Sequence, residues 1–399
     1  MKKKYRGWGG IILLLLIFLL GGQAWGADGG TEGGLTPQQV ISKQLNSLDL
    51  TQVEKNIEEL EREFGEYIPS INLRDLFISQ EGKGFKFDFV QLFNGVLQYF
   101  FREVVANLNL LGKLMVLAVI YSLLRNLQSS FAGGTVSKLA NAICYLAVMG
   151  LAIGSFQLAL GTGKEAIERM VTFMQALTPI LLTILAAMGG LVSVSIFQPL
   201  TMLIISLIST LMGNVVLPLI TFSAILTLIS HLSEGFPLSR LAGLFKEGAM
   251  ACMGLFLSIF MGAVLIQGAV ASIADGVSLQ TAQFATKTFI PVVGGLFSDA
   301  LEMVLGCSLL IRNALGGVGI LVIIIICLFP SLKIIAIVLT YRLAAALIQP
   351  IGDGNLVECL GSIGNSLLLV FAVLAVVTLM FFIMITVLVG IGNITAMLT

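Results

Sequence analysis

Charge is distributed very unevenly along this chain, and this limits the possible folds more than any other feature. Of 44 Asp, Glu, Lys and Arg residues, 20 lie between Asp28 and Glu103, and only 20 are spread over the nearly three hundred residues that follow. Charged residues make up 11% of the chain, against about 25% in soluble domains. The mean hydropathy is +1.01. The sequence therefore predicts a polytopic transmembrane domain over residues 105–399.

The first 26 residues have the parts of a secretory signal peptide. Four basic residues precede the apolar run Ile11–Leu20, which is too short for an ordinary spanning helix. Small residues in Ala24-Trp25-Gly26 suit a signal peptidase, so we expect cleavage after Gly26, with an uncleaved anchor as the alternative. Either form delivers an acidic, amphipathic segment over residues 27–104 to the extracytoplasmic side.

Two helices are predicted early in this exported segment. Thr36 followed by Pro37 is typical of a first helix start, and Thr51 with Glu54 forms a capping box for a second helix, which Gly65 ends. The second helix is acidic on one face and apolar on the other. The apolar stripe either packs on the protein's own surface or docks an extracytoplasmic partner; it consists of Val53, Ile57, Leu60 and Phe64.

A third amphipathic helix is predicted from Phe89 to Val104, directly before the first spanning segment. Its apolar residues repeat at i, i+3, i+4 and i+7. Helices in this position usually lie in the plane of the lipid headgroups, so we expect an interfacial helix here.

Eight apolar segments follow, and all are expected to be helical because backbone groups in lipid must pair within their own segment. Their boundaries are 108–124, 140–160, 176–197, 200–230, 248–274, 289–311, 317–348 and 366–390. Segments 200–230 and 317–348 are too long for one simple span, and each contains a proline. The prolines expected to break or bend helices are Pro179, Pro218, Pro291 and Pro330.

The positive-inside rule orients these segments. With the N-terminal segment outside, the loop that carries Arg125 and Lys138 is cytoplasmic, as the rule expects, and the loop over residues 164–169 is outside. Segment 289–311 either crosses fully, which leaves Arg312 outside, or forms a re-entrant hairpin, which keeps Arg312 inside. The rule favours the hairpin, with about seven transmembrane helices and a cytoplasmic C-terminus.

The proline spacing suggests an internal repeat. Pro179 and Pro291 are 112 residues apart, and so are Pro218 and Pro330. Three crossings per unit would give the two repeats inverted topologies, as in many transporters. Such a repeat requires segments 176–197 and 289–311 to insert alike, which conflicts with making only one of them re-entrant.

Ionisable residues at membrane depth are functional candidates because burial there is costly. Asp299 and Glu302 share one helix face, and a carboxylate pair opposite a buried Lys or Arg could line a polar path or bind a proton. In the alternative interpretation the carboxylates lie at the membrane interface and the arginine snorkels. The candidate polar path consists of Asp299, Glu302, Lys333, Arg342 and Asn214.

No motif indicates catalysis, a cofactor or a metal. The chain has a single histidine, its five cysteines share no metal-ligand spacing, and neither GxxxxGK[ST] nor GxGxxG occurs. The net charge is zero, so the chain lacks the excess of positive charge that is typical of proteins that bind nucleic acid. We therefore expect neither an enzyme nor a nucleic-acid-binding protein.

The region from Lys287 to Gly364 carries a specific resemblance. It includes FIPVVGGLFSDALEMVLGCSLLIRNALG and LFPSLKIIAIVLTYRLAAALIQPIGDGNLVECLGSIG, and TPILLTILAAMGG begins at Thr178. Together with the N-terminal signal peptide, these stretches strongly resemble the stage III sporulation protein AE family of endospore-forming bacteria.

The resemblance implies a multi-pass protein of the mother-cell membrane around the engulfed forespore. Members of the family belong to an assembly of mother-cell membrane proteins that meets a forespore membrane protein across the intermembrane space. This assembly is thought to be a channel or specialised secretion apparatus that supports late forespore gene expression. The alternative is a stand-alone, permease-like transporter of a small solute. The exported acidic helices favour the assembly, and an inverted repeat would favour the permease.

Overall fold

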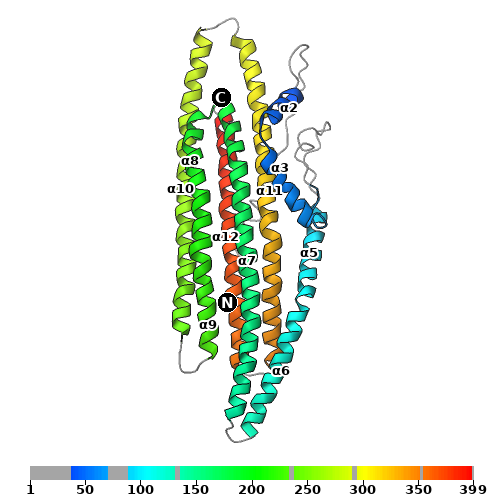
Figure 1. The fold of residues 1–399 in the computed structure, drawn as a ribbon. Coiled ribbons are helices and arrows are strands. Elements are labelled where there is room, and N and C mark those ends of the chain that lie inside the picture. Colours follow the sequence, from blue (N-terminus) through cyan, green and yellow to red (C-terminus); the bar gives the residue numbers. More distant parts are fainter. Residues whose placement is uncertain are drawn as a thin grey trace, which may run out of the picture. The chain divides into compact units, whose positions relative to one another are not determined.

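The chain is all-helical in the part that the computed structural model describes (Figure 1). This part comprises residues 37–70, 89–130, 135–232, 238–289, 294–350 and 354–397. Six helical runs within it are long and apolar enough to cross a membrane. The predicted all-α polytopic fold is therefore confirmed. The signal peptide over residues 1–26 lies outside the described residues and stays a prediction.

The segment predicted to be exported contains two helices, α2 (Pro37–Ser47) and α3 (Thr51–Phe64). Both start where the sequence predicts, but the start of α3 differs from the predicted capping box. The Thr51 backbone N–H donates to Asp49 Oδ1 at 3.2 Å, and no side chain caps the helix at Leu50. Hydrogen bonds from the Thr51 side chain and backbone lower the pKa of Asp49. The carboxylate upstream of the predicted cap thus satisfies the first free amide.

Helices α5 (Phe89–Ala106) and α6 (Leu108–Ser130) are joined through the single residue Asn107. Helix α5 packs along α11. Helices α5 and α6 together form one candidate span, Val90–Leu124. The amphipathic helix predicted to lie in the headgroup plane therefore extends the first spanning helix instead of standing apart from it.

Five long helical runs complete the chain (Figure 1). They are α7 (Thr135–Ala187), α8 (Leu191–Leu211) continued by the π-helix η1 (Met212–Val216) and α9 (Leu217–Leu232), α10 (Ser239–Phe289), α11 (Gly294–Ile348) and α12 (Gly354–Met397). Helices α7, α11 and α12 pack on one another and form the centre of the bundle. Helices α8, α9 and α10 cover one side, and α5 and α6 lie against α11.

Two predicted interruptions are absent. Helix α7 continues through Pro179 and joins the predicted segments 140–160 and 176–197, so the stretch over residues 164–169 is helical and the predicted loop is wrong. Helix α11 likewise continues through Pro330 and joins residues 294–311 to segment 317–348. A proline removes one backbone hydrogen bond but does not force a loop when neighbouring helices hold both sides of the break.

Pro218 has a different effect. It follows the π-helix η1, and the Leu217 backbone N–H donates to Met212 O, five residues earlier. This wider turn accommodates a proline, whose ring would otherwise clash with the carbonyl of Asn214 four residues before it. Pro291 lies outside the described residues. The hinge role of these prolines stays a prediction.

The sequence predicts about seven transmembrane helices, and the described residues contain six candidate spans, so the number of crossings stays a prediction. If all six spans cross, the far end of α12 lies on the same side of the membrane as α3. The end of α6, which carries Arg125, and the start of α7, which carries Lys138, lie at the other end of the bundle, as does the start of α10 with Arg240 and Lys246 (Figure 1). The positive-inside rule therefore favours a cytoplasmic location for that end. Six crossings satisfy the positive-inside rule without a re-entrant segment.

We therefore expect a periplasmic-type reporter, such as alkaline phosphatase, to be active when fused after Ile391, because six crossings from an extracytoplasmic N-terminal segment would end α12 on the extracytoplasmic side. The same reporter fused between Arg125 and Lys138 should be inactive and serves as the control. Activity of a cytoplasmic reporter after Ile391 would instead support seven crossings.

Candidate functional site

The apolar stripe of α3 packs on the protein itself. Val53, Ile57, Leu60 and Phe64 are only 1 to 5% exposed, and α3 lies against α7. This arrangement matches the first of the two sequence interpretations, in which the stripe covers the protein's own surface. A partner could reach these four side chains only after α3 had left the bundle, so docking through them stays a prediction.

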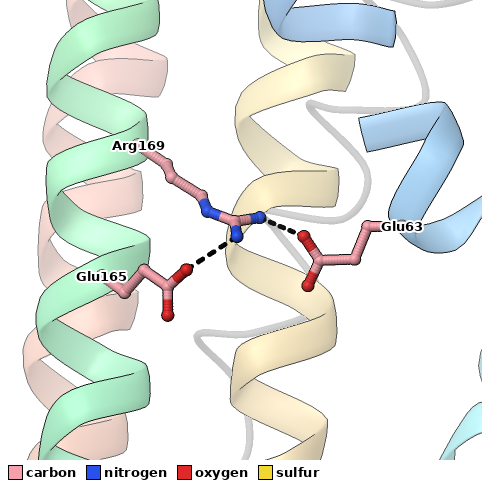
Figure 2. A network of polar contacts seen from close by, with 3 residues as sticks. All are labelled: Glu63, Glu165 and Arg169. Atoms are coloured by element: carbon pink, nitrogen blue, oxygen red, sulfur yellow. Dashed lines mark hydrogen bonds and ion pairs between the residues drawn. The ribbon is translucent and has the colours of Figure 1, made fainter. Parts of the chain in front are cut away.

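A charged clamp joins the end of α3 to the middle of α7. Arg169 of α7 donates through Nη1 to the Glu63 carboxylate of α3 and through Nη2 to Glu165 Oε1 at 2.7 Å (Figure 2). The three side chains are between 39 and 62% exposed. One guanidinium thus bridges a carboxylate of its own helix and one from α3.

An aromatic cluster lies directly beside this clamp. The ring of Phe64, the residue after Glu63, stacks on Phe329 of α11 with a centroid distance of 4.2 Å and an interplanar angle of 5°. Tyr99 of α5 meets both rings edge-on, at 6.0 and 4.9 Å. Edge-to-face contacts of this kind add to the free energy gained from burial alone. The cluster therefore connects three helices at one point.

The chain after α3 is held against α5 as well. Arg102 of α5 donates to Tyr67 Oη and lies 3.6 Å from Glu66 Oε2. Gly95 of α5 leaves room for the Tyr67 carbonyl, which a Cβ atom at that position would strike. Helix α2 is attached to α11 by a hydrogen bond that Gln44 Nε2 donates to Ser308 Oγ at 2.8 Å. Helices α2 and α3 and the residues after α3 are thus fastened to α5, α7 and α11.

The apolar contacts dominate the free energy of this attachment. A half-exposed ion pair contributes at most about 1 kcal/mol, whereas burial of one large apolar side chain contributes about 1.5–3 kcal/mol. Four such side chains of α3 are buried. The Arg169 clamp therefore fixes the position of α3 more than it stabilises its docking.

The outer face of α3 carries the charge that the stripe lacks. Glu58 and Glu59 are exposed and Glu54 and Glu61 are half-buried, alongside the exposed basic residues Lys55 and Arg62. This face is a predominantly acidic surface on a helix that is attached to the spanning bundle.

The candidate polar path does not assemble within one chain. Asp299, Glu302, Lys333 and Arg342 all belong to α11, and Lys333 follows Glu302 by 31 residues. At ~1.5 Å of rise per residue this separation is about 46 Å along the helix axis. The carboxylates and the two basic residues therefore do not face one another, although the sequence interpretation required the segments to pack side by side. The side chains of Asp299 and Glu302 lie outside the described residues.

The other candidates of this path lie nearer the surface. Lys333 is half-buried, Arg342 is exposed and donates to Asn365 Oδ1 of α12 at 3.5 Å, and Asn214 is exposed on η1. Sequence reasoning instead missed Arg312 as a buried charge. Arg312 is fully buried, and its Nη2 donates to the Leu388 carbonyl of α12. The signal that could have identified it is an arginine within an otherwise apolar segment of the sequence.

One small cavity lies between α7, α9 and α12. Its volume is about 40 Å³, and its lining includes Phe156, Ala224 and Ser362. The only histidine of the chain, His231, lies with Nε2 3.4 Å from Ser362 Oγ. This volume holds a few water molecules and is far below the about 300 Å³ of an ordinary ligand site. Within the described residues, no group of three or more His, Cys, Asp or Glu side chains is placed to hold a metal.

Comparison with known proteins gives one consistent result. Residues 71–392 match the family described as stage III sporulation protein AE. Stage III sporulation protein AE of Bacillus subtilis (strain 168) is 36% identical over 393 residues, which cover 97% of this chain and 98% of that protein. No solved structure matches the chain.

The two parts of the α3 attachment should respond differently to mutation. Phe64→Ala should raise hydrogen exchange of the α3 amides more than about a hundredfold, because losing a buried aromatic ring costs about 3–5 kcal/mol. Arg169→Met should raise it less than about fivefold, as expected of a half-exposed ion pair. Exchange measured by mass spectrometry on the purified full chain tests both, with Arg62→Met on the outer face as the control. Equal effects of Phe64→Ala and Arg62→Met would contradict the attachment.

Proposed function

The chain belongs to the stage III sporulation protein AE family, and from this we propose that it is a membrane subunit of an assembly joining mother cell and forespore. Family membership supports a role in sporulation. In this proposal residues 1–26 direct export, residues 27–104 lie in the intermembrane space, and residues 105–399 are embedded in the mother-cell membrane. Its partners would be other sporulation membrane proteins and, through them, a forespore membrane protein.

The observation that carries the proposal is the attachment of α3. A stand-alone transporter has little need of an acidic helix outside its spanning bundle, whereas a subunit that meets partners across an intermembrane space does. The outer face of α3 is solvent-exposed, and its inner face is fixed to α7 and α11 through Arg169 and Phe329. A partner bound to the outer face would therefore be held in a defined position relative to the central helices.

The permease alternative gains no support from the described residues. The candidate charges of the polar path are spread along one helix, and the cavity between α7, α9 and α12 is too small for an ordinary solute site. Any conduit in the proposed assembly would form between subunits.

Charge reversal on the outer face of α3 tests this proposal. The Glu58→Lys/Glu59→Lys double variant should insert and accumulate normally, because both side chains are exposed. It should nevertheless lower spore yield and late forespore reporter activity at least about tenfold, since a basic partner surface would be repelled. Spore counts, reporter assays and recovery of membrane partners in mild detergent measure the outcome.

The matched control is Glu247→Lys, a reversal of an exposed glutamate on α10 near the opposite end of the bundle. This variant should sporulate normally. Full spore yield and unchanged partner recovery from the α3 double variant would overturn the proposal that its outer face binds a partner.

A further inference from the structure

Helix α11 has a weak point at Pro330, which lies inside the helix. A proline has no backbone N–H, so the carbonyl of Ile326, four residues earlier, receives no helical hydrogen bond from it. The proline ring also crowds that carbonyl, and proline is one of the few causes of a sharp bend in a long helix. Helix α11 can therefore bend more easily here than in its regular turns. We call this point the Pro330 hinge.

Small polar groups bridge the hinge on the side that faces α12. Cys327 Sγ and Ser331 Oγ lie one turn apart across the break, at 3.4 Å from each other. Cys327 Sγ also donates to the Leu374 carbonyl of α12 at 3.9 Å. A thiol is only a weak donor. These contacts therefore keep the break in place without making it stiff.

The attachment of α3 lies directly on this hinge. Phe329, the residue before Pro330, is fully buried, and Phe64 of α3 stacks on its ring. The ring of Tyr99 meets Phe329 edge-on, and the centroid of the Tyr67 ring lies 6.2 Å from it. Three aromatic rings from α3, α5 and the residues after α3 thus converge on the residue next to the break.

The two halves of α11 are held by different helices. Helix α2 packs on α11, and its Gln44 donates to Ser308, which precedes Pro330 by 22 residues, or ~33 Å of helix. On the other side of the hinge, α6 runs beside the C-terminal half of α11 (Figure 1). Only residues 48–50 separate α2 from α3. The α2–α3 pair therefore holds the hinge and the N-terminal half, whereas α6 holds the C-terminal half.

The outer face of α3 lies close to the hinge. Glu58 and Glu59 precede Phe64 by only five or six residues, which is about 9 Å of helix. A short helix moves as one body, so a ligand that tilts or shifts α3 also moves Phe64 against Phe329.

We propose that α3 sets the angle between the two halves of α11 at the Pro330 hinge, so that binding on its outer face changes the packing at the centre of the bundle. This inference rests on the proposed function, in which a partner binds that face. With α3 docked, Phe64 and α2 fix one angle. A partner that shifts α3 moves both contacts, and it favours a second angle to the extent that it binds that arrangement more tightly.

A hinge role differs from simple covering of apolar surface by α3. Covering buries the same side chains whether or not a proline lies beneath them. The two roles therefore predict different results when Pro330 is replaced.

Distances between pairs of spin labels on the purified full chain test the hinge without a partner. Labels at Leu310→Cys of α11 and Ile266→Cys of α10 report on the N-terminal side of the hinge. Labels at Leu343→Cys of α11 and Leu241→Cys of α10 report on the other side, and all four leucine and isoleucine side chains are exposed. The chain's own cysteines are replaced by alanine, except for Cys327→Ser, which keeps a polar group at the hinge.

The Phe64→Ala variant, which loosens α3, should broaden the distance distribution of the first label pair and leave the second pair unchanged. A bend of about 20° displaces Leu310, ~30 Å from the hinge, by about 10 Å, which sets the expected scale of the broadening. Adding Pro330→Ala restores the missing N–H and should return the first pair to its original width. Equal widths with and without Phe64→Ala, or a broadening that persists with Pro330→Ala, would overturn the proposal.

A second experiment connects the hinge to sporulation. Pro330→Ala leaves the outer face of α3 intact, so it should accumulate and recover membrane partners normally. It should nevertheless lower late forespore reporter activity at least about fivefold, the usual size of coupling between two sites. The matched control is Pro199→Ala, which changes a proline inside α8 and should behave as the unaltered chain.

The outcomes separate the hinge from the proposed function. Full reporter activity of Pro330→Ala would overturn the hinge and leave partner binding by α3 untouched. Loss of partner recovery by Pro330→Ala would also overturn it, because the hinge is inferred to act after the partner has bound. The Glu58→Lys/Glu59→Lys variant tests partner binding alone.

Discussion

The packing of α7, α11 and α12 on one another supports every other part of the described structure. Met170, Phe173 and Leu177 of α7 are fully buried in this core, and Phe329 of α11 is buried at its edge. Phe329 is also the surface on which Phe64 stacks. The position of helix α3 therefore depends on the same close packing that holds the long helices together.

The length of these helices has consequences for assembly. A bundle about twice as long as a bilayer is thick must expose part of its surface outside the lipid. On the side of α5, α7 and α11, helices α2 and α3 cover the bundle, and the outer face of α3 is predominantly acidic. On the side of α8 and α10, apolar side chains stay exposed in the described residues. The two sides thus differ in chemistry, one being mostly acidic and the other apolar.

Several sequence predictions failed for a common reason. The charged stretch around Arg169 indicates a loop, and the prolines at 179 and 330 indicate helix breaks, when each is considered locally. In the structure all three lie within continuous helices, Arg169 and Pro179 in α7 and Pro330 in α11. Helices α7, α11 and α12 pack along one another, and this packing holds each helix on both sides of its disruption. The separate spans predicted on either side of these residues consequently merge, and the polar residues assigned to facing segments become distant positions on one helix.

The sequence by itself determined the helical, membrane-spanning character of the chain, because apolar segments in lipid have to pair their backbone groups internally. It also determined the amphipathic α3, whose stripe from Val53 to Phe64 follows from helical periodicity. Only the tertiary structure decided what that stripe contacts. It also decided that Arg312 is buried, that Arg169 bridges Glu63 and Glu165, and that Pro330 is tolerated in α11. These features depend on residues more than a hundred positions apart or on neighbouring helices, and no local pattern encodes which helices become neighbours.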